Sequence, residues 1–243
     1  MNDPDISIVI PAKDEAENLT HVVSEIATVL AGYDVEVIVV DDGSIDETAA
    51  TLHDLRNRYA NLRQIVHRQS CGKSAAILSG VRAAKASMIC TLDGDGQNDP
   101  RYLPELVALA RKPGVGLAAG QRMKHAHSFM KKISSRLANG LRRGLLRDNT
   151  RDTACGLKAF SKDVFLRLPY FDTMHRFLPA LVLREGLEVR HLDVVDRVRL
   201  RGHSKYGVVD RALTGALDLV GVNWLIARRR NIPQAAEISV AEP

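Results

Sequence analysis

Two carboxylates and an amide occur at every second position near the middle of the chain. Asp93, Asp95 and Gln97 come directly after an apolar run that predicts a buried strand over 87–92. On an extended loop, side chains two residues apart can face the same side. Two carboxylates this close are unfavourable unless a cation is present. Mg²⁺ or Mn²⁺ takes oxygen ligands and leaves positions for substrate phosphates, so the stretch predicts a site for a metal and a diphosphate.

Three other interpretations compete with the metal site. Asp99 and Pro100 are typical of a helix N-cap and first helical residue, which explains those two residues only. An EF-hand loop counted from Asp93 would need Gly at its sixth position and Glu at its twelfth, where Asn98 and Pro104 stand. The third interpretation, two solvated surface acids, stays open on this stretch alone.

Strands and helices alternate in the chain before this site. The apolar pattern predicts strands over 6–10, 35–40, 62–67 and 87–92, with helices that begin near 12, 46, 73 and 100. Right-handed crossovers place such helices on both faces of a mostly parallel sheet. Polar loops follow all four strand ends, and ligands of such sheets bind beyond the carboxyl ends of the strands. The predicted fold class is therefore α/β, with four loops converging on a nucleotide-sized site.

Two familiar nucleotide motifs are excluded. Gly72-Lys73-Ser74 resembles the end of a P-loop, but His67 stands where the first glycine of that loop is required. No G-x-G-x-x-G opens the first predicted helix, which argues against a dinucleotide-dependent dehydrogenase.

The positive charge of the chain is concentrated in one segment. The 243 residues carry a net charge of +5, and residues 121–147 hold eight Lys or Arg and no Asp or Glu. Such a segment attracts nucleic acid, anionic lipid or phosphorylated substrates. Phe129 is the only aromatic residue in it, which argues against nucleic acid. The three cysteines have no paired spacing and the start of the chain has no signal-peptide pattern, so a cytoplasmic protein with reduced thiols is expected.

Six short stretches then occur in a specific order, at 9–19, 40–46, 93–97, 152–158, 175–181 and 201–207. In this order the chain resembles family 2 glycosyltransferases of the GT-A fold, and most of all the branch of dolichol-phosphate-mannose synthases and bacterial polyprenyl-phosphate glycosyltransferases. The last three stretches point to the lipid-phosphate branch. Lys13 and Asp14 depart from the Tyr and Asn that the family more often has. The resemblance implies a GT-A fold with a mostly parallel central sheet and helices on both faces.

The resemblance also implies a donor half of the site. Asp93, Asp95 and Gln97 would hold Mg²⁺ or Mn²⁺, with Asp95 and Gln97 as the more direct ligands and Asp95 catalytic through the metal. The residues implied in binding the nucleotide sugar are Pro11, Lys13, Glu15, Asp42, Lys73, Asp93 and Asp95. For Lys73, a solvated lysine at a helix start is an open alternative.

A separate acceptor half is implied by the later stretches. Asp152 would lie beside the acceptor as a catalytic residue, while Arg176, Arg201 and Lys205 would bind its phosphate. A helix N-cap or a salt bridge to Arg151 or Lys158 is the open alternative for Asp152. Because a phosphate monoester is mostly ionised at pH 7, Asp152 should matter less as a base than with a hydroxyl acceptor.

The C-terminal half is expected to contact a membrane. Residues 126–147 have apolar positions at spacings of three and four with cations between them, which predicts a basic interfacial helix within a GT-A domain over 1–211. Residues 212–230 predict a second amphipathic helix, too short to span, with Trp224 and the arginines at 228–230 as interface anchors. It could lie on the membrane, pack against the basic helix or form a dimer contact. Residues 231–243 are expected to be a disordered tail.

The expected function is inverting, metal-dependent transfer of a sugar from a nucleotide sugar to a polyprenyl phosphate, by a peripheral protein on the inner face of the cytoplasmic membrane. The expected partners are the donor, the lipid acceptor and an anionic membrane surface, with no nucleic acid and a possible homo-oligomer. Two alternatives remain. One is a family 2 enzyme acting on a soluble or glycan hydroxyl, and the other is a catalytically silent scaffold that binds nucleotide sugars at the membrane.

Overall fold

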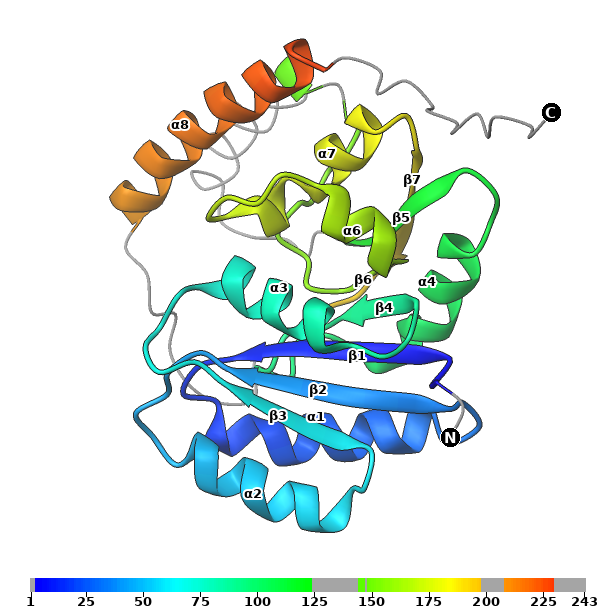
Figure 1. Ribbon diagram of the computed structural model, residues 1–243, viewed down its shortest axis with the longest axis vertical. Coiled ribbons are helices and arrows are strands. Elements are labelled where there is room, and N and C mark those ends of the chain that lie inside the picture. The colour runs from blue at the N-terminus through cyan, green and yellow to red at the C-terminus, as the bar shows by residue number, and fades with distance from the viewer. Residues whose placement is uncertain (1–2, 124–143, 147, 198–207, 230–243) are drawn as a thin grey trace, which may run out of the picture.

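A seven-stranded sheet forms the centre of the computed structural model, which describes residues 3–123, 144–146, 148–197 and 208–229 (Figure 1). The strand order is β3-β2-β1-β4-β6-β5-β7. The strands are β1 (Ile6–Ala12), β2 (Val35–Asp41), β3 (Leu62–Val66), β4 (Met88–Thr91), β5 (Val115–Arg122), β6 (Lys158–Ser161) and β7 (Glu188–Val194). All neighbouring pairs are parallel except those of β6, which is antiparallel to β4 and β5.

Helices cover both faces of this sheet, as predicted. The first face carries α1 (Ala16–Val29), α2 (Thr48–Arg58) and α4 (Leu103–Ala110), the last preceded by the short helix η1 (Pro100–Tyr102). The second face carries α3 (Lys73–Ala83), α6 (Lys162–Arg167), α7 (Leu178–Arg184) and α8 (Val208–Ala227), together with the short helix η2 (Met174–Arg176). Successive side chains of β1 enter different cores, because a strand alternates its faces: Ile8 and Ile10 pack on the first face and Val9 on the second.

The predicted βαβ series is confirmed, with two local differences. β1 runs through Pro11 to Ala12, because its pairing with β4 ends at Val9 and a proline beyond that point removes no bond of that ladder. Helix α1 begins only at Ala16, so that the first loop is longer than predicted. Asp14, with a φ of 49°, turns the chain there before the helix starts.

The second half of the sheet was not predictable from the alternating pattern. β6 enters between β4 and β5 and runs against both, so the stretch around Asp152 is brought beside the end of β4. Alternating apolar and charged residues at 194–200 predict a strand, but β7 ends at Val194 and residues 195–197 are not in a strand.

Several predictions fall on residues that the structure does not describe. These are Arg201, Lys205, the tail at 231–243 and most of the basic helix at 126–147, of which residues 144–146 are described and helical. Among the described residues, none of the helices combines the length and the apolar character needed to cross a bilayer.

Candidate active site

Four loops meet at the carboxyl edge of the sheet, as the sequence predicts. The first loop is joined to the second because the Asp14 backbone N–H donates to Ser44 Oγ at 2.9 Å and the Ile45 N–H donates to Asp14 Oδ1 at 2.8 Å. Glu15 stands just before α1, and its N–H donates to Thr48 Oγ1 at 2.9 Å. These bonds hold the turn that contains Lys13 and Glu15, which follows the end of β1 where Pro11 lies.

Asp42 connects the second loop to the third. Its buried carboxylate accepts hydrogen bonds from the backbone N–H groups of Cys71 and Gly72, both at 2.8 Å, and from Ser70 Oγ at 2.8 Å. His67 Nδ1 lies 2.7 Å from the same carboxylate. Burial acts to raise the pKa of Asp42, but the hydrogen bonds outweigh it and the pKa is lowered. Asp42 is therefore a charged clamp on the loop before α3.

Lys73 and Asp93 connect the third loop to the fourth. Lys73 is the first residue of α3, and its Nζ lies 2.5 Å from Asp93 Oδ1. The alternative of a solvated lysine is therefore wrong. On the other side, Asn98 Oδ1 accepts from the Asp93 backbone N–H at 3.0 Å. Gly156 completes the enclosure, since a Cβ there would lie 2.4 Å from Asp93 Oδ1 and 2.5 Å from Asn98 Oδ1.

The metal prediction concerns Asp93, Asp95 and Gln97. Their side chains are all partly exposed, whereas Gly94 and Gly96 between them are buried. The chain turns at 94–96, with a φ of 75° at Gly96, so it is not the extended loop that the sequence predicts. Asp95 Oδ1 accepts from the Gln97 N–H at 3.1 Å. Two carboxylates and an amide oxygen are the hard donors that Mg²⁺ or Mn²⁺ binds, with further positions left for phosphate oxygens. The residues present therefore fit such an ion.

Arg197 is hydrogen-bonded to the loop that contains Gln97, and this corrects an expectation from the sequence about Arg197. The alternating pattern at 194–200 predicts a surface arginine on a strand. Instead the Arg197 N–H donates to the Gln97 carbonyl at 2.9 Å, and its guanidinium lies 2.7 Å from Glu25 and 2.9 Å from Asp99. Burial acts to raise the pKa of Asp99, but Arg101 and Arg197 lower it to about 2. Asp99 also accepts from the Arg101 N–H, so its predicted N-cap role is confirmed.

Asp152 pairs with Arg122, the last residue of β5. Arg122 Nε lies 2.5 Å from Asp152 Oδ2 and Nη2 lies 3.0 Å from Oδ1, a two-point ion pair. The sequence left open a salt bridge from Asp152 to Arg151 or Lys158. Asp152 does form a salt bridge, but its partner is Arg122. Burial acts to raise the pKa of Asp152, yet the bonds from Arg122 lower it. This carboxylate is held ionised.

A chain of hydrogen bonds joins the two halves of the site. Arg122 Nη1 lies 3.3 Å from Asp196 Oδ2, and Asp196 Oδ1 accepts from Asn98 Nδ2 at 3.2 Å. Asn98 in turn holds the Asp93 N–H. Asp93 and Asp152 are thus linked through three side chains. Arg122 and Asp196 were not predicted as site residues, because they pair with each other and with Asp152 and Asn98, which lie far away along the chain, and no spacing marks them.

A buried lysine was also missed. Lys158, the first residue of β6, is 5% exposed and donates from Nζ to the Cys155 carbonyl. Burial, with Lys73 nearby, lowers the pKa of Lys158 to about 8 against the pull of the thiol and acidic groups around it. The only signal in the sequence was its place in the stretch 152–158.

Arg176, in η2, is the one described residue of the three cations predicted to bind the acceptor phosphate. Its neighbour His175 lies with Nδ1 2.8 Å from Ser74 Oγ, which joins η2 to the residue after Lys73. Burial and the cations Lys73, Lys158 and Arg176 hold the pKa of His175 well below its ordinary value. Among the described residues, none accepts a hydrogen bond from the buried Nε of Arg176. The structure therefore places one cation of the predicted set beside the donor loops.

Comparison with known proteins shows the family to which the chain belongs. The model of a family described as glycosyl transferase family 2 matches residues 7–168. A dodecaprenyl-phosphate galacturonate synthase of Rhizobium johnstonii is 31% identical over 93% of this chain and 69% of its own length. An undecaprenyl-phosphate 4-deoxy-4-formamido-L-arabinose transferase of Edwardsiella ictaluri is 28% identical over 84% of this chain and 63% of its own length. The chain therefore belongs to glycosyl transferase family 2, and it spans about two thirds of these relatives.

Solved structures agree on the fold. Mannosyl-3-phosphoglycerate synthase from Rubrobacter xylanophilus is similar with a TM-score of 0.72 and 16% identity, covering 97% of this chain and 79% of that one. Glucosyl-3-phosphoglycerate synthase from Mycobacterium tuberculosis, in complex with Mn²⁺, uridine diphosphate and glucosyl-3-phosphoglycerate, has a TM-score of 0.69 and 19% identity over 94% and 81% of the chains. The predicted GT-A fold is confirmed.

Proposed function

We propose that this glycosyltransferase moves a sugar from a nucleoside diphosphate sugar to a polyprenyl phosphate. The relatives named for dodecaprenyl and undecaprenyl phosphate support this acceptor class. The observation that carries it is the two-point ion pair of Asp152 with Arg122. A carboxylate held in that way is a poor proton acceptor, and a phosphate monoester, with a second pKa near ~6, needs none at pH 7.

The donor half would work through the loops at the sheet edge. Pro11, Lys13 and Glu15 would bind the base and ribose, while Asp42 keeps the loop before α3 in place for the nucleotide. Asp93, Asp95 and Gln97 would hold Mg²⁺ or Mn²⁺, an assignment supported by the Mn²⁺ and uridine diphosphate in a structural relative. When bound, the ion supplies Lewis-acid stabilisation of the departing diphosphate.

The transfer would be a single displacement. An ionised oxygen of the acceptor phosphate forms a bond to C1 of the sugar while the bond from C1 to the diphosphate breaks, and the electron pair leaves with the diphosphate. Attack from the opposite face inverts the anomeric configuration. Arg176, whose buried Nε has no hydrogen-bond acceptor among the described residues, would bind the lipid phosphate together with Arg201 and Lys205.

A hydroxyl acceptor and a silent scaffold are both less well supported. A hydroxyl must lose its proton to a base, and Asp152, the carboxylate predicted at the acceptor, is occupied by Arg122. A scaffold would have no need of Asp93 and Asp95 at the end of β4, enclosed by Lys73 and Gly156. The enzyme would act as a peripheral protein on the inner face of the cytoplasmic membrane, where such lipid acceptors reside.

Sugar transfer can be measured directly with labelled uridine and guanosine diphosphate sugars, Mn²⁺ and undecaprenyl phosphate, scoring label in the lipid phase. One donor should give product that requires Mn²⁺ or Mg²⁺. Arg176→Ala should raise the KM for the lipid at least tenfold and leave the KM for the donor unchanged. Asp54→Ala, an exposed change on α2, is the matched control for loss of one charged side chain. Absence of lipid product with every donor would contradict the proposal.

A further inference from the structure

One side of α8 is apolar and exposed to solvent. From 216 to 227 the exposed positions are Ala216, Leu217, Val220, Gly221, Trp224 and Ala227, which we call the α8 stripe. They recur every three or four residues and so form one face about 18 Å long at 1.5 Å per residue. Leu217, Val220 and Trp224 are 74%, 69% and 58% exposed. No exposed side chain in this span is polar, which is unusual for a helix in water.

The opposite side of α8 packs against the rest of the protein. Val222 is 1% exposed, and Leu219 and Ile226 pack with it against the core of the second sheet face. Arg184 of α7 donates from Nε to the Leu225 carbonyl at 3.0 Å. Asp218, the one acidic residue between 215 and 227, is bonded to Thr173. The α8 stripe is therefore not the face that holds the helix to the protein.

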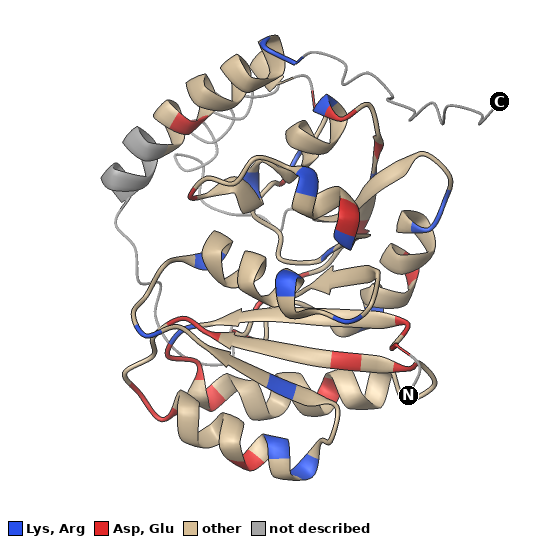
Figure 2. Cartoon of the chain, viewed as in Figure 1, with Lys and Arg blue, Asp and Glu red and all other residues tan. Residues whose placement is uncertain are grey.

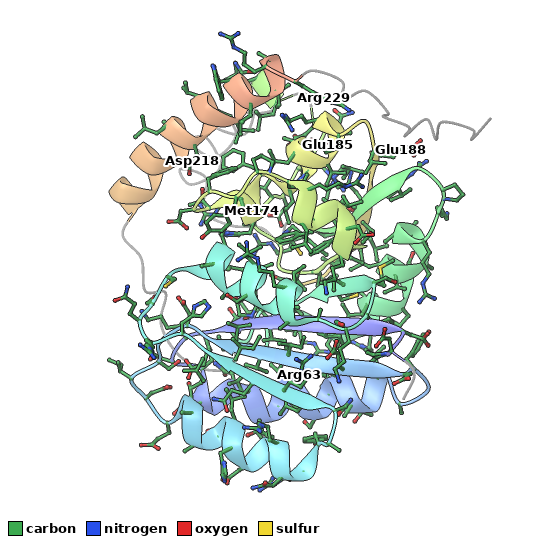
Figure 3. The ribbon with its side chains drawn as sticks, in the orientation of Figure 1. Arg63, Met174, Glu185, Glu188, Asp218 and Arg229 are labelled. Atoms are coloured by element: carbon green, nitrogen blue, oxygen red, sulfur yellow. The ribbon has the colours of Figure 1, made fainter. Side chains whose placement is uncertain are left out.

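Positive charge adjoins the stripe at its C-terminal end. Figure 2 shows the described part of α8 without Lys or Arg until that end, where Arg228 and Arg229 follow the helix. Neither forms an ion pair with a described residue. Arg229 reaches the end of α7, with its guanidinium within 3.3 Å of the Cβ position of Gly186, near Glu185 (Figure 3). Glu185 itself is paired with Arg184 at 2.6 Å.

A cavity of about 320 Å³ opens between α7 and α8 at the same end. It is lined by Leu146, Ala180, Leu183, Arg184, Ile226 and Arg229. Apolar walls flanked by two guanidinium groups suit an amphiphile that carries a negative head. The stripe, the arginines and this cavity together match a layer with an apolar interior beneath anionic headgroups.

We propose that the α8 stripe docks on an anionic lipid bilayer. Leu217, Val220 and Trp224 enter the boundary between headgroups and acyl chains, and Arg228 and Arg229 bind lipid phosphates. The proposal rests on the proposed function for its purpose, because a polyprenyl phosphate is reached only at a membrane. Figure 1 shows α8 beginning on the side of the molecule toward which β1 and β2 run, so docking brings the carboxyl edge of the sheet near the lipid.

A second copy of the chain fits the α8 stripe less well than a bilayer does. Even if each of the three large side chains buried the roughly 150–250 Å² of an aromatic residue, the total would stay below the about 800 Å² per partner of a stable interface. In a parallel symmetric pair of stripes the arginines at the end would also face their own copies. A bilayer needs neither a large protein interface nor an acidic partner surface.

Trp224 is the single tryptophan of the chain and therefore reports directly on docking. Vesicles of phosphatidylcholine with phosphatidylglycerol should shift its emission to shorter wavelength, and vesicles of phosphatidylcholine alone should do so far less. Leu217→Gln with Val220→Gln should weaken partitioning at least tenfold. Arg228→Gln with Arg229→Gln should weaken it about tenfold or more and reduce its salt dependence. Tyr33→Gln with Leu166→Gln, exposed apolar positions elsewhere, should bind like the wild type.

Three results would overturn the docking proposal. They are an unshifted Trp224 emission with anionic vesicles, equal partitioning of the stripe variant and the control, and a dimer in light scattering that the stripe variant abolishes while vesicle binding is kept. Thermal unfolding of each variant checks that the fold is intact. Transfer to a short, water-soluble prenyl phosphate separates the two proposals. Sugar transfer without vesicle binding would refute only the docking proposal. Vesicle binding without any sugar transfer would refute only the proposed function.

Discussion

Gly156 lies where one added methyl group would disturb the centre of the donor half. In Gly156→Ala the new Cβ would stand 2.4 Å from Asp93 Oδ1 and 2.5 Å from Asn98 Oδ1. A carbon and an oxygen in contact are normally about 3.3–3.6 Å apart, so both side chains must move by roughly 1 Å. Asp93 is held by Lys73, and the Gly156 carbonyl accepts from Thr91 Oγ1 at 2.6 Å. Neither the Asp93 side chain nor the backbone at Gly156 is therefore free to move away.

The size of the effect follows from this overlap. Overpacking of a tight site costs about 1–3 kcal/mol of the free energy of unfolding, whereas a displacement of 1 Å in a positioned catalytic group lowers turnover about 10²-fold. Gly156 does not have a positive φ, so backbone strain adds nothing. We therefore expect Gly156→Ala to fold and to transfer sugar about a hundredfold more slowly, with a higher Mn²⁺ requirement.

Gly32→Ala is the matched control, because no atom lies within 4 Å of its Cβ position. Initial rates of sugar transfer over a range of Mn²⁺ concentrations, together with urea denaturation, measure both effects. Gly32→Ala should retain wild-type turnover. If Gly156→Ala turned over within twofold of the wild type at the same Mn²⁺, the argument that Asp93 must be held against Gly156 would be refuted.

Three further predictions concern single side chains. Asp95→Ala should abolish metal-dependent turnover without lowering the unfolding temperature by more than a few degrees; activity that survives in this variant would remove Asp95 from the metal site. Asp42→Asn, which loses a charged acceptor, should speed hydrogen exchange of the Cys71 and Gly72 amides at least tenfold; unchanged exchange would contradict the clamp. Lys158 has a pKa of about 8 when folded and 10.5 when unfolded, so between these values only the unfolded chain keeps the proton and stability rises with pH. In urea titrations across this pH range, the wild type should gain about 3 kcal/mol in free energy of unfolding relative to Lys158→Met; the same pH dependence in both proteins would refute the assignment.

The first half of the fold could be predicted because its signals are local. Apolar runs, polar loops and Gly72 before α3 placed β1 to β4 and their helices within a few residues. The position of β6 could not be predicted this way, because a four-residue strand that runs antiparallel to both of its neighbours has no periodicity of its own. The stretch that contains Asp152 owes its place in the site to that strand.

The candidate site, like the fold, could be predicted only in part. The convergence of the four loops was predictable, since parallel strands end at one edge of a sheet. The pairing of Arg122 with Asp152, and of Arg197 with Glu25 and Asp99, joins residues far apart in the chain and follows from no spacing. An alternating pattern made Arg197 resemble a surface residue, although it lies beyond the end of β7 and its partners are Glu25 in α1 and Asp99 before η1.

The acceptor phosphate is the central claim, and one paired measurement tests it most directly. Undecaprenyl phosphate and undecaprenol differ only in the phosphate, so transfer of labelled sugar to each can be compared with the same donor, metal and detergent. Because Asp152 is held by Arg122 and an ionised phosphate needs no base, product should form with the phosphate alone. Equal transfer to undecaprenol would contradict the account.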